Sequence, residues 1–370
     1  MDKPAWDRLL QGIEALVPAM QEDAIQLDER ADCPRTAFAA LTALGLLNAT
    51  VSKSCGGLGL GDGRAGALAL LRVFVLLGRG NLAIARLYEA HVNALLLIDR
   101  FGSASLVAQM ANDAAEGHIF ALWVTDSVNA PLALRRHTEG FILDGGKAFC
   151  SGGGVATRAL ITAATDTGTQ MLMVALEPNK RVSPSSVRLS GMRAAITGSV
   201  DFSGMMVERG SLLGDVDDYM GEPIFSAGAW RGSACALGGL SALVDLHRNE
   251  LVSRHRDADP HQRARFGQLL IAYETASLWT REAALRGCLL DRPAEEIVAY
   301  INLTRLAVEA ACLDGMRLTQ RSLGLGAFIK GSRGELICRD LATYLRQPAT
   351  DEILESASEY YFHATLADER

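Results

Sequence analysis

The chain has 370 residues and a formal net charge of −7, with 49% apolar and only 6% aromatic residues. A chain of this length is expected to form two or three domains of about 100 to 200 residues around a sizeable core, which excludes a mini-protein and a disordered tail. Acidic residues outnumber basic ones, so the overall basic charge of a nucleic-acid-binding protein is absent and no nucleic-acid partner is expected.

The chain shows no sign of export, membrane insertion or metal binding. It is charged from Asp2 onward, without the apolar run of a secretory signal. The longest apolar stretches, 39–51 and 67–77, fall short of the roughly 20 residues that cross a bilayer. Seven cysteines are scattered without a Cys-x-x-Cys pair, and the seven histidines form no obvious metal pair. We therefore expect a cytoplasmic protein with reduced thiols, no membrane segment and no bound metal.

Helical periodicity fills the first part of the chain. In 5–20, Trp6, Leu9, Ile13 and Val17 recur at the spacing of one helix face. Similar patterns predict further helices over 36–47, 64–77, 82–101 and 104–116. We interpret residues 1–117 as an N-terminal all-α domain.

Short apolar runs between turn residues follow. They lie at 120–124, 140–143, 159–163 and 171–176, and such runs favour strands. The turns between them are predicted at Asp144-Gly145, 166–168 and 178–180. We interpret residues 118–222 as a middle β domain.

Long helical patterns return after Pro223. They cover 224–256, 266–290 and 294–323, with alanine-rich faces that let helices approach closely. These lengths suit a helical bundle, and we assign residues 223–370 to a C-terminal bundle domain. The order of the three blocks predicts a mostly α protein with a central β domain.

Five short segments have the residue types of a cofactor site: 54–60, 123–127, 146–154, 263–267 and 320–326. Each also has a structural interpretation, as a flexible helix connection, a strand exit, a turn, a solvated arginine or a helix cap. Arginines and glycine amides commonly hold a diphosphate. The pair Gly324-x-Gly326 follows a helix rather than a strand, so it is not a classical NAD-binding fingerprint.

In their order and spacing these segments resemble the acyl-CoA dehydrogenase superfamily of flavoproteins over nearly the whole chain. The motifs that carry the resemblance are 56–60, 79–81 leading to His91, 124–126, 146–149, 263–267, 320–326 and Arg339-Asp340. The resemblance implies an N-terminal helical domain, a middle β-barrel-like domain and a C-terminal four-helix bundle. It also implies bound FAD, an oxidoreductase activity, and a homodimer or homotetramer in which an adjoining subunit completes the cofactor site.

The resemblance assigns cofactor contacts residue by residue. Thr125 would contact the flavin ring, Phe149 would flank it, and Ser151 would hydrogen-bond near its reactive nitrogen. Thr350 matches a threonine near the same cofactor. The positions that would hold the diphosphate and adenosine half, often across a subunit interface, are Arg263, Phe266, Gln320, Gly324 and Gly326.

The sequence departs from the family at the catalytic base. Family dehydrogenases remove the α-proton of an acyl thioester with a glutamate. Counted from Arg339-Asp340, that position falls on Pro348. In some relatives the glutamate instead precedes an arginine that matches Arg231, and here Trp230 stands before it. Both familiar base positions therefore lack a carboxylate.

Three hypotheses remain open. The first is a dehydrogenase for an unusual acyl thioester with a relocated base, for which Asp351 and Glu352 are the nearest candidates; a solvated helix turn is the favoured interpretation of that pair. The second is a flavin-dependent oxidase or monooxygenase for a small-molecule substrate, which needs no α-proton base. The third is a non-catalytic flavin-binding or interaction protein. The intact 263–267 and 320–326 segments speak against complete loss of the flavin.

Overall fold

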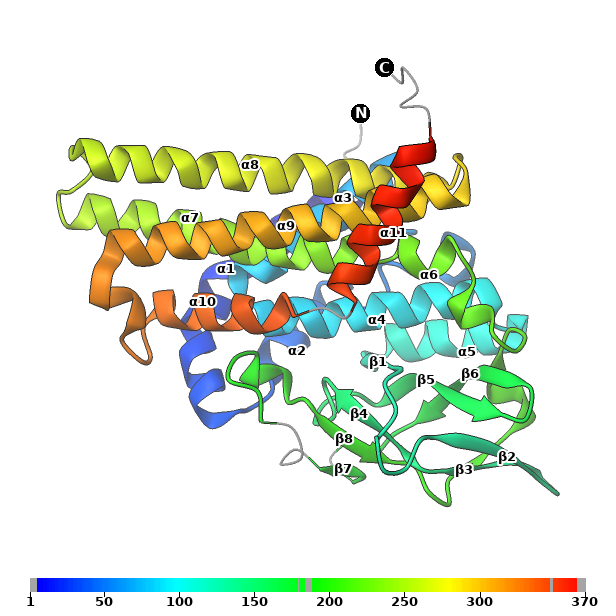
Figure 1. Cartoon of the computed structure of the whole chain (residues 1–370). Coiled ribbons are helices and arrows are strands. Elements are labelled where there is room, and N and C mark those ends of the chain that lie inside the picture. The colour runs from blue at the N-terminus through cyan, green and yellow to red at the C-terminus, as the bar shows by residue number, and fades with distance from the viewer. Residues whose placement is uncertain (1–4, 179, 184–187, 347–348, 365–370) are drawn as a thin grey trace.

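The computed structural model describes residues 5–178, 180–183, 188–346 and 349–364, arranged as a helical part stacked on a β domain (Figure 1). The N-terminal helices are α1 (Ala5–Arg30), α2 (Arg35–Ala43), α3 (Gly63–Gly80), α4 (Leu82–Phe101) and α5 (Ala104–Ala115). Helix α4 has the predicted bounds, because the Asn81 side chain caps it by accepting the amide of Ala83. Helix α1 continues beyond the predicted end at residue 20, since Ala24 and Asp28 remain buried on its inner face.

The β domain contains two sheets. Its strands are β1 (Phe120–Trp123), β2 (Ala133–His137), β3 (Gly140–Asp144), β4 (Gly146–Cys150), β5 (Arg158–Thr165), β6 (Gly168–Ala175), β7 (Val182–Ser183), β8 (Gly198–Asp201), β9 (Met206–Val207) and β10 (Leu212–Leu213). The larger sheet has the order β10-β6-β5-β2-β3-β9, and β1 pairs with β5 in parallel, placing Phe120 opposite Arg158. The smaller sheet has the order β4-β8-β7. Trp123, Phe202 and their neighbours form a core within this domain.

The predicted turns have different outcomes. The turn at 166–168 joins the antiparallel strands β5 and β6, as predicted. The turn at Asp144-Gly145 was predicted to close a hairpin, and this is wrong, because β3 and β4 lie in different sheets. Gly145 has φ +106, and a Cβ there would lie 2.3 Å from the Pro131 carbonyl oxygen, so glycine permits the bend between sheets. The third predicted turn includes Asn179, which lies outside the described residues.

The C-terminal part is helical. Its helices are α6 (Ile224–Ala227), α7 (Trp230–Ser253), α8 (Pro260–Leu289), α9 (Ala294–Leu323), α10 (Arg333–Tyr344) and α11 (Thr350–His363). Helix α9 matches its predicted bounds, whereas the helix predicted over 224–256 is divided between α6 and α7. Helix α8 begins before the predicted residue 266, since Asp259 caps it by accepting the amides of His261 and Gln262. Helices α7 to α10 form the bundle, and α11 crosses α9 (Figure 1).

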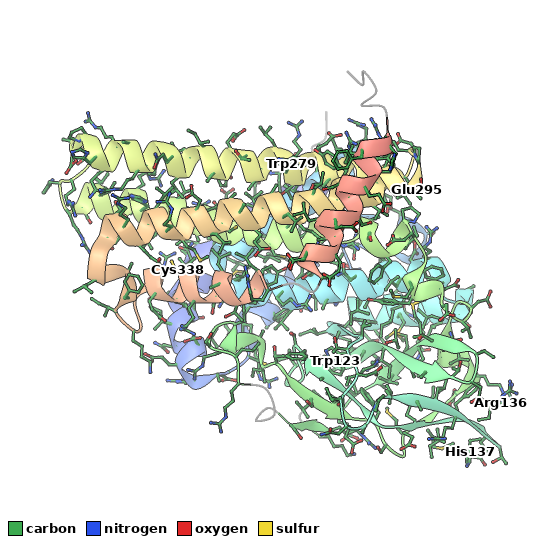
Figure 2. All side chains as sticks on the ribbon, in the orientation of Figure 1. Trp123, Arg136, His137, Trp279, Glu295 and Cys338 are labelled. Atoms are coloured by element: carbon green, nitrogen blue, oxygen red, sulfur yellow. The ribbon has the colours of Figure 1, made fainter. Side chains whose placement is uncertain are left out.

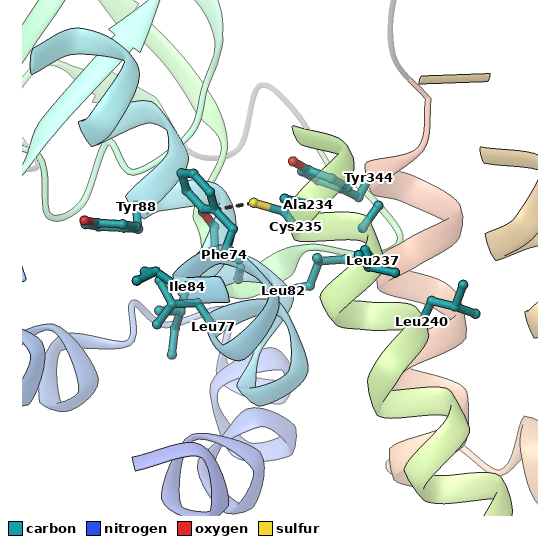
Figure 3. Packing of buried hydrophobic residues seen from close by; sticks show 14 of the residues in the cluster. Phe74, Leu77, Leu82, Ile84, Tyr88, Ala234, Cys235, Leu237, Leu240 and Tyr344 are labelled. Carbon is teal, nitrogen blue, oxygen red and sulfur yellow. Dashed lines mark hydrogen bonds between the residues drawn. The ribbon is translucent and has the colours of Figure 1, made fainter. Parts of the chain in front are cut away.

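One large core joins the N-terminal helices to the bundle. It includes Phe74 and Leu77 of α3, Tyr88 of α4 and Leu237 of α7 (Figure 3). None of the described helices is long and apolar enough to cross a membrane. All seven cysteines fall within the described residues and have free thiols. The predicted fold class, mostly α with a central β domain and a C-terminal bundle, is confirmed.

Helices α3 and α7 touch through glycines. A Cβ at Gly78 would lie 2.4 Å from the Cys235 carbonyl oxygen, and a Cβ at Gly238 would lie 2.6 Å from that of Val75. Real Cβ atoms do not approach other atoms this closely, so the two backbones must separate if either glycine gains a side chain. The junction between the first and last parts of the helical core depends on this crossing.

We predict that Gly238→Ala lowers the free energy of unfolding by about 1–3 kcal/mol, because the added methyl group overpacks the α3–α7 crossing. Urea unfolding followed by circular dichroism measures this. The matched control is Gly267→Ala within α8, where a Cβ has no neighbouring atom within 4 Å. That control should keep its stability or gain up to about 1 kcal/mol from helix propensity. Equal unfolding midpoints for the two variants would contradict the prediction.

Candidate functional site

The ends of β1 and β4 present an aromatic ring and a hydroxyl group on one surface. The carbonyl oxygen of Thr125 accepts the amide of Ala148 at 2.9 Å. Thr125 therefore lies beside the residue of β4 that directly precedes Phe149. Thr125 is exposed, and 56% of Phe149 is exposed, unusual for a large apolar side chain. Phe149 has φ +54, a conformation that costs a non-glycine residue about 1 kcal/mol or more. Two residues assigned to the flavin ring therefore lie together.

Lys147 is a buried residue of β4 that holds the segment after β1 in place. Its side chain is buried, and its ammonium donates to the Val124 carbonyl oxygen at 2.6 Å, to the Asp126 carboxylate at 2.6 Å and to the Thr162 hydroxyl at 3.1 Å. Burial lowers the pKa of Lys147, while the carboxylate of Asp126 opposes this shift. The lysine thus ties the exit of β1 to β4, which sets the positions of Thr125 and Phe149.

Ser151 follows Phe149 closely in the chain, and its amide donates to the Phe149 carbonyl oxygen at 3.0 Å. Its carbonyl oxygen accepts the indole N–H of Trp123 at 2.9 Å, and its hydroxyl group is 3.1 Å from that of Thr197. Figure 2 labels Trp123 at the edge of the β domain that faces the helices. The Ser151 side chain is nearly buried, so its hydroxyl group is held in place beside the exposed surface.

Arg339 and Asp340 hold helix α10 against other parts of the fold. The Asp340 carboxylate accepts the Met192 amide at 2.6 Å, and the Arg339 guanidinium pairs with Asp28 at 2.7 Å. Burial raises the pKa of Asp340 to about 7, although the Met192 amide acts in the opposite direction. These bonds join α10 to α1 and to the loop that ends at Ala195, whose carbonyl oxygen accepts the Gly152 amide at 2.7 Å. The pair therefore connects the bundle to the neighbourhood of Ser151.

The residues assigned to the diphosphate gather at another place. The side chains of Gln262 and Ser322 hydrogen-bond, which joins the start of α8 to the end of α9. Arg263 is exposed, and its Nε donates to the Asp257 carbonyl oxygen at 2.8 Å. The Phe266 ring packs edge-on against His247, with ring centroids 5.7 Å apart.

The glycines of this group lie in an open turn after α9. Gly324 has φ +62, and a Cβ there would have no neighbour within 4 Å; at Gly326 the nearest atom would belong to Arg254, at 3.8 Å. Gln320 reaches the Cys338 thiol of α10. Figure 1 shows this end of the bundle well away from the ends of β1 and β4. Within one chain, the two groups of predicted cofactor residues are therefore not brought together.

Two cavities lie between the helices. The first, of about 430 Å³, is bordered by Asp62, Asn93, Tyr219 and Arg231 among others. The second, of about 550 Å³, lies between α7, α9 and α11. Glu89 of α4 borders both cavities.

A buried polar network surrounds Glu89. Arg86, Glu89 and Asn93 share one face of α4, because their spacing matches the helical repeat. Glu89 Oε2 accepts the Arg86 guanidinium at 2.8 Å and the Tyr344 hydroxyl at 3.1 Å, while Oε1 accepts the Asn93 amide at 3.4 Å. The Arg231 Nε donates to the Asn93 oxygen. The network therefore links α4 to α7 and α10.

Electrostatics keep the partners of Glu89 protonated. Burial alone would lower the pKa of Arg86, but the carboxylate of Glu89, together with Tyr344 and Cys235, outweighs burial and the pKa is raised. Burial raises the pKa of Tyr344 well above its ordinary value, and Cys235 and Glu89 add to this. Burial lowers the pKa of Arg231 to about 10, against the pull of Glu89, so its guanidinium remains charged near neutral pH.

One further cluster has metal-ligating residue types. Asp113, Glu116 and His118 place one ligand atom each within 4.8 Å of one another. Asp113 is ion-paired with Arg158 at 2.5 Å, and His118 is hydrogen-bonded to Thr157 at 2.9 Å. Two of the three ligands thus already have protein partners, and we assign no metal to the cluster.

Comparison with known proteins agrees with this architecture. Residues 14–118 match the family model of the acyl-CoA dehydrogenase N-terminal domain. The amino sugar nitrososynthase DnmZ of Streptomyces peucetius is 28% identical over 222 residues, which cover 57% of this chain and 54% of that protein. The match thus spans about half the length of this curated relative.

Solved structures share the fold over nearly the whole chain. TdsC of Paenibacillus sp. A11-2, bound to FMN, has a TM-score of 0.85 at 18% identity and covers 96% of this chain and 97% of its own. KijD3, in complex with FMN and dTDP-3-amino-2,3,6-trideoxy-4-keto-3-methyl-D-glucose, has a TM-score of 0.81 at 20% identity and covers 100% and 96%. Acyl-CoA dehydrogenases are also among the structures with this fold. Residues 14–118 thus match the acyl-CoA dehydrogenase N-terminal domain, and the chain as a whole has the fold of the acyl-CoA dehydrogenases.

The base positions expected from the superfamily can now be located. Trp230 is only 2% exposed and packs edge-on against Phe74, with ring centroids 6.2 Å apart. Pro348 lies outside the described residues. Asp351 and Glu352 are both exposed in the first turn of α11. Thr350 and Glu352 border the second cavity, whereas Asp351 is not among its described lining residues.

The Glu89 network was missed by sequence reasoning. Its signal was present, since Arg86, Glu89 and Asn93 are polar residues at helical spacing within the largely apolar segment 82–101. That pattern alone is typical of a solvated helix edge. Only the fold shows that Tyr344, 255 positions later in the chain, covers Glu89.

We predict that Lys147→Met lowers the free energy of unfolding by about 1–3 kcal/mol, since it removes the buried charged hydrogen bonds but keeps the apolar stem. Thermal or urea unfolding measures the loss. In the control Lys180→Met, the ammonium that is removed pairs with Glu177 at a site where both side chains are more than half exposed. That change should stay within about 0.5 kcal/mol of wild type. A loss no larger than that of the control would show that Lys147 does not hold the strand exits.

Proposed function

We propose that this chain is a flavin-dependent monooxygenase that transfers oxygen to a small-molecule substrate, with FAD as the flavin. The observation that carries the proposal is a contrast. The surface assigned to the flavin ring is formed, with Thr125 and Phe149 side by side, while neither base position of the superfamily offers a carboxylate. A reaction that removes no α-proton accounts for both observations. When bound in its reduced form, a flavin supplies the activation of dioxygen that such a reaction needs.

The residues present fit a flavin. The exposed Phe149 ring offers an apolar face for a planar ring system, and Thr125 and Ser151 supply hydroxyl groups from neighbouring backbone positions. The exposed guanidinium of Arg263 and the open backbone at Gly324 suit a diphosphate. Phe266, Gln320, Gly326 and Thr350 complete the set of proposed cofactor residues.

We propose that two copies of the chain form each flavin site. In Figure 1 the end of α9, which precedes Gly324 and Gly326, lies well away from β1 and β4, and this separation supports a site shared between two chains. Helix α8 also exposes large apolar side chains at Leu270, Ile271 and Leu278. Apolar surface of this kind suits contact with another copy. The assembly would be a homodimer or homotetramer.

The relatives support oxygen transfer. TdsC is a dibenzothiophene monooxygenase, and DnmZ is an amino sugar nitrososynthase. Dehydrogenation of an acyl thioester is the second candidate, favoured by Glu352, which borders the second cavity beside Thr350. In that case Glu352 or Asp351 would be the relocated base near Arg231.

We further propose a cytoplasmic location, because all seven thiols are free in the described chain. The proposed domain limits stay at 1–117, 118–222 and 223–370.

The purified protein is expected to bind added FAD and turn yellow. With a flavin reductase and NADH, it should consume oxygen in step with substrate for at least one of two probes: indole, which a TdsC structure contains, and the dTDP-linked amino sugar of the KijD3 complex. Butyryl-CoA, mixed anaerobically without NADH, should leave the flavin oxidised, because neither base position expected from the superfamily carries a carboxylate. Bleaching by butyryl-CoA would favour the dehydrogenase instead. A protein that binds no flavin would reject both candidates.

Mixing two variants tests the shared site. Phe149→Ala damages the ring half and Arg263→Ala the diphosphate half, and each alone should weaken FAD binding about tenfold or more. Co-expressed in equal amounts, the two variants should regain about a quarter of the tight sites, because mixed dimers contain one undamaged site. If each chain holds its own flavin, co-expression restores no tight site. Light scattering should show a dimer or tetramer.

A further inference from the structure

We propose that the first cavity binds a small organic carboxylate, whose charged end pairs with Arg231 and whose apolar body packs against leucine side chains. This binding is a separate property from the proposed oxygen transfer and does not depend on a bound flavin. The cavity, of about 430 Å³, has the size of a pocket for a small molecule.

Arg231, at the start of α7, has hydrogen-bond donors that no described protein group uses. Its Nε donates to the Asn93 side-chain oxygen, whereas Nη1 and Nη2 have no hydrogen-bond partner among the described residues. Glu89 forms its ion pair with Arg86 at 2.8 Å and attracts Arg231 without such a contact. Two unused Nη groups of one guanidinium can bind both oxygens of a carboxylate.

The buried network around Glu89 carries more positive than negative charge. Arg86 and Arg231 are both guanidinium ions, and Glu89 is the carboxylate bonded within the network. The Tyr344 hydroxyl and the Cys235 thiol stay neutral, because burial raises the pKa of both groups. A buried charge without a counter-ion is costly. A ligand with one negative charge would balance the network, whereas a phosphate monoester, with nearly two, would exceed the balance.

Gly228 makes room for the Arg231 guanidinium. It lies between α6 and α7 at φ −74, a value that any residue adopts, so the backbone itself does not require glycine here. A Cβ at this position would lie 2.3 Å from Arg231 Nη2. Since Gly228 borders the first cavity, the absent side chain leaves Nη2 at the cavity wall.

Tyr219 offers a second donor to the same cavity. It borders the cavity from the segment between β10 and α6, and its ring packs edge-on against Phe225, with centroids 5.5 Å apart. Burial raises the pKa of Tyr219 to about 12, although the charge of Arg86 opposes this shift, so the phenol keeps its proton. Its hydroxyl group has no hydrogen-bond partner among the described residues. A carboxylate can therefore accept from both Tyr219 and Arg231.

One part of the cavity wall is apolar and suits the body of such a ligand. Three charged residues, Asp62, Asp99 and Arg100, also border the cavity, but they are exposed, and water and salt screen exposed charges. The apolar residues of the wall include Leu70, Leu96, Leu97, Leu122, Trp230 and Leu290. A ligand with a short apolar body and one terminal carboxylate matches this wall.

The test compares 4-phenylbutyrate with its neutral amide, 4-phenylbutyramide, by isothermal titration calorimetry at neutral pH. It uses the full-length protein saturated with FAD and is repeated without added FAD. Wild type should bind the carboxylate about tenfold or more tightly than the amide. Arg231→Gln should weaken carboxylate binding about tenfold to a hundredfold and leave the amide within about threefold, so the preference disappears. A merely structural role for Arg231 would weaken both probes alike.

A second variant remains informative if Arg231→Gln folds poorly. Tyr219→Phe removes only a hydroxyl group that has no described partner, so the fold should be kept. It should weaken carboxylate binding about threefold to tenfold. The matched control is Arg305→Gln, which removes another half-buried arginine that borders the second cavity but is not among the described lining of the first. Both probes should bind this control as they bind wild type.

Several outcomes would overturn the proposal. Equal affinities of wild type for the two probes, or no binding of either, reject a carboxylate site. An unchanged preference for the carboxylate in Arg231→Gln, or its loss in Arg305→Gln as well, removes Arg231 as the binding group. Carboxylate binding by a protein that takes up no flavin would reject the proposed function while supporting this site, so the two failures are distinguishable.

Discussion

The close crossing of α3 and α7 determines how the rest of the helical part is placed. Gly78 and Gly238 let the two backbones touch, so a helix from the first part of the chain packs directly against the bundle. Helix α4 starts at Leu82, immediately after α3, and its position follows from this crossing. The start of α7 carries Arg231 and Gly232 to the polar face of α4. The polar network around Glu89 thus depends on a contact that contains no polar side chain.

Helix α4 also connects the helical part to the β domain. His91, two residues after Glu89, is buried, and burial lowers its pKa to about 4. The ring is therefore neutral, with Nε2 donating to the Leu47 carbonyl oxygen and Nδ1 accepting the Phe120 amide at the start of β1. One helix turn joins the polar network to β1, the strand that leads to Thr125. The cavities and the proposed flavin surface are consequently held in one rigid frame.

The buried charges around Glu89 are costly for stability. A buried ion pair is often no more stabilising than well-packed apolar residues, because both ions lose their hydration. Here Arg86 and Arg231 surround one carboxylate, and the Tyr344 hydroxyl occupies a further acceptor position. Such a network next to cavities is typical of a functional site. The cluster that surrounds this network consists of apolar side chains, aliphatic and aromatic, which makes the exception more informative.

The sequence predicts the long helices well and the shortest strands poorly. The segments 82–101 and 294–323 match α4 and α9, since caps and glycines bound strong periodic patterns. Strands β7, β9 and β10 have two residues each, too few for any pattern. The buried Lys147 in β4 contradicts the rule that lysines are exposed, because its charge is satisfied by Asp126 and a carbonyl oxygen.

For the candidate site, the family resemblance assigned Thr125 and Phe149 to the same flavin ring. In the fold the two residues lie close together, because β4 runs beside the segment that follows β1. The network of Glu89 required knowledge of which distant residue covers α4. Glu89 stands in the middle of a capped helix and is held by Arg86, Asn93 and Tyr344, which come from its own helix and from α10. The pattern of α4 alone places these polar residues on one helix face, whereas their burial follows only from the packing of α7 and α10 against that face.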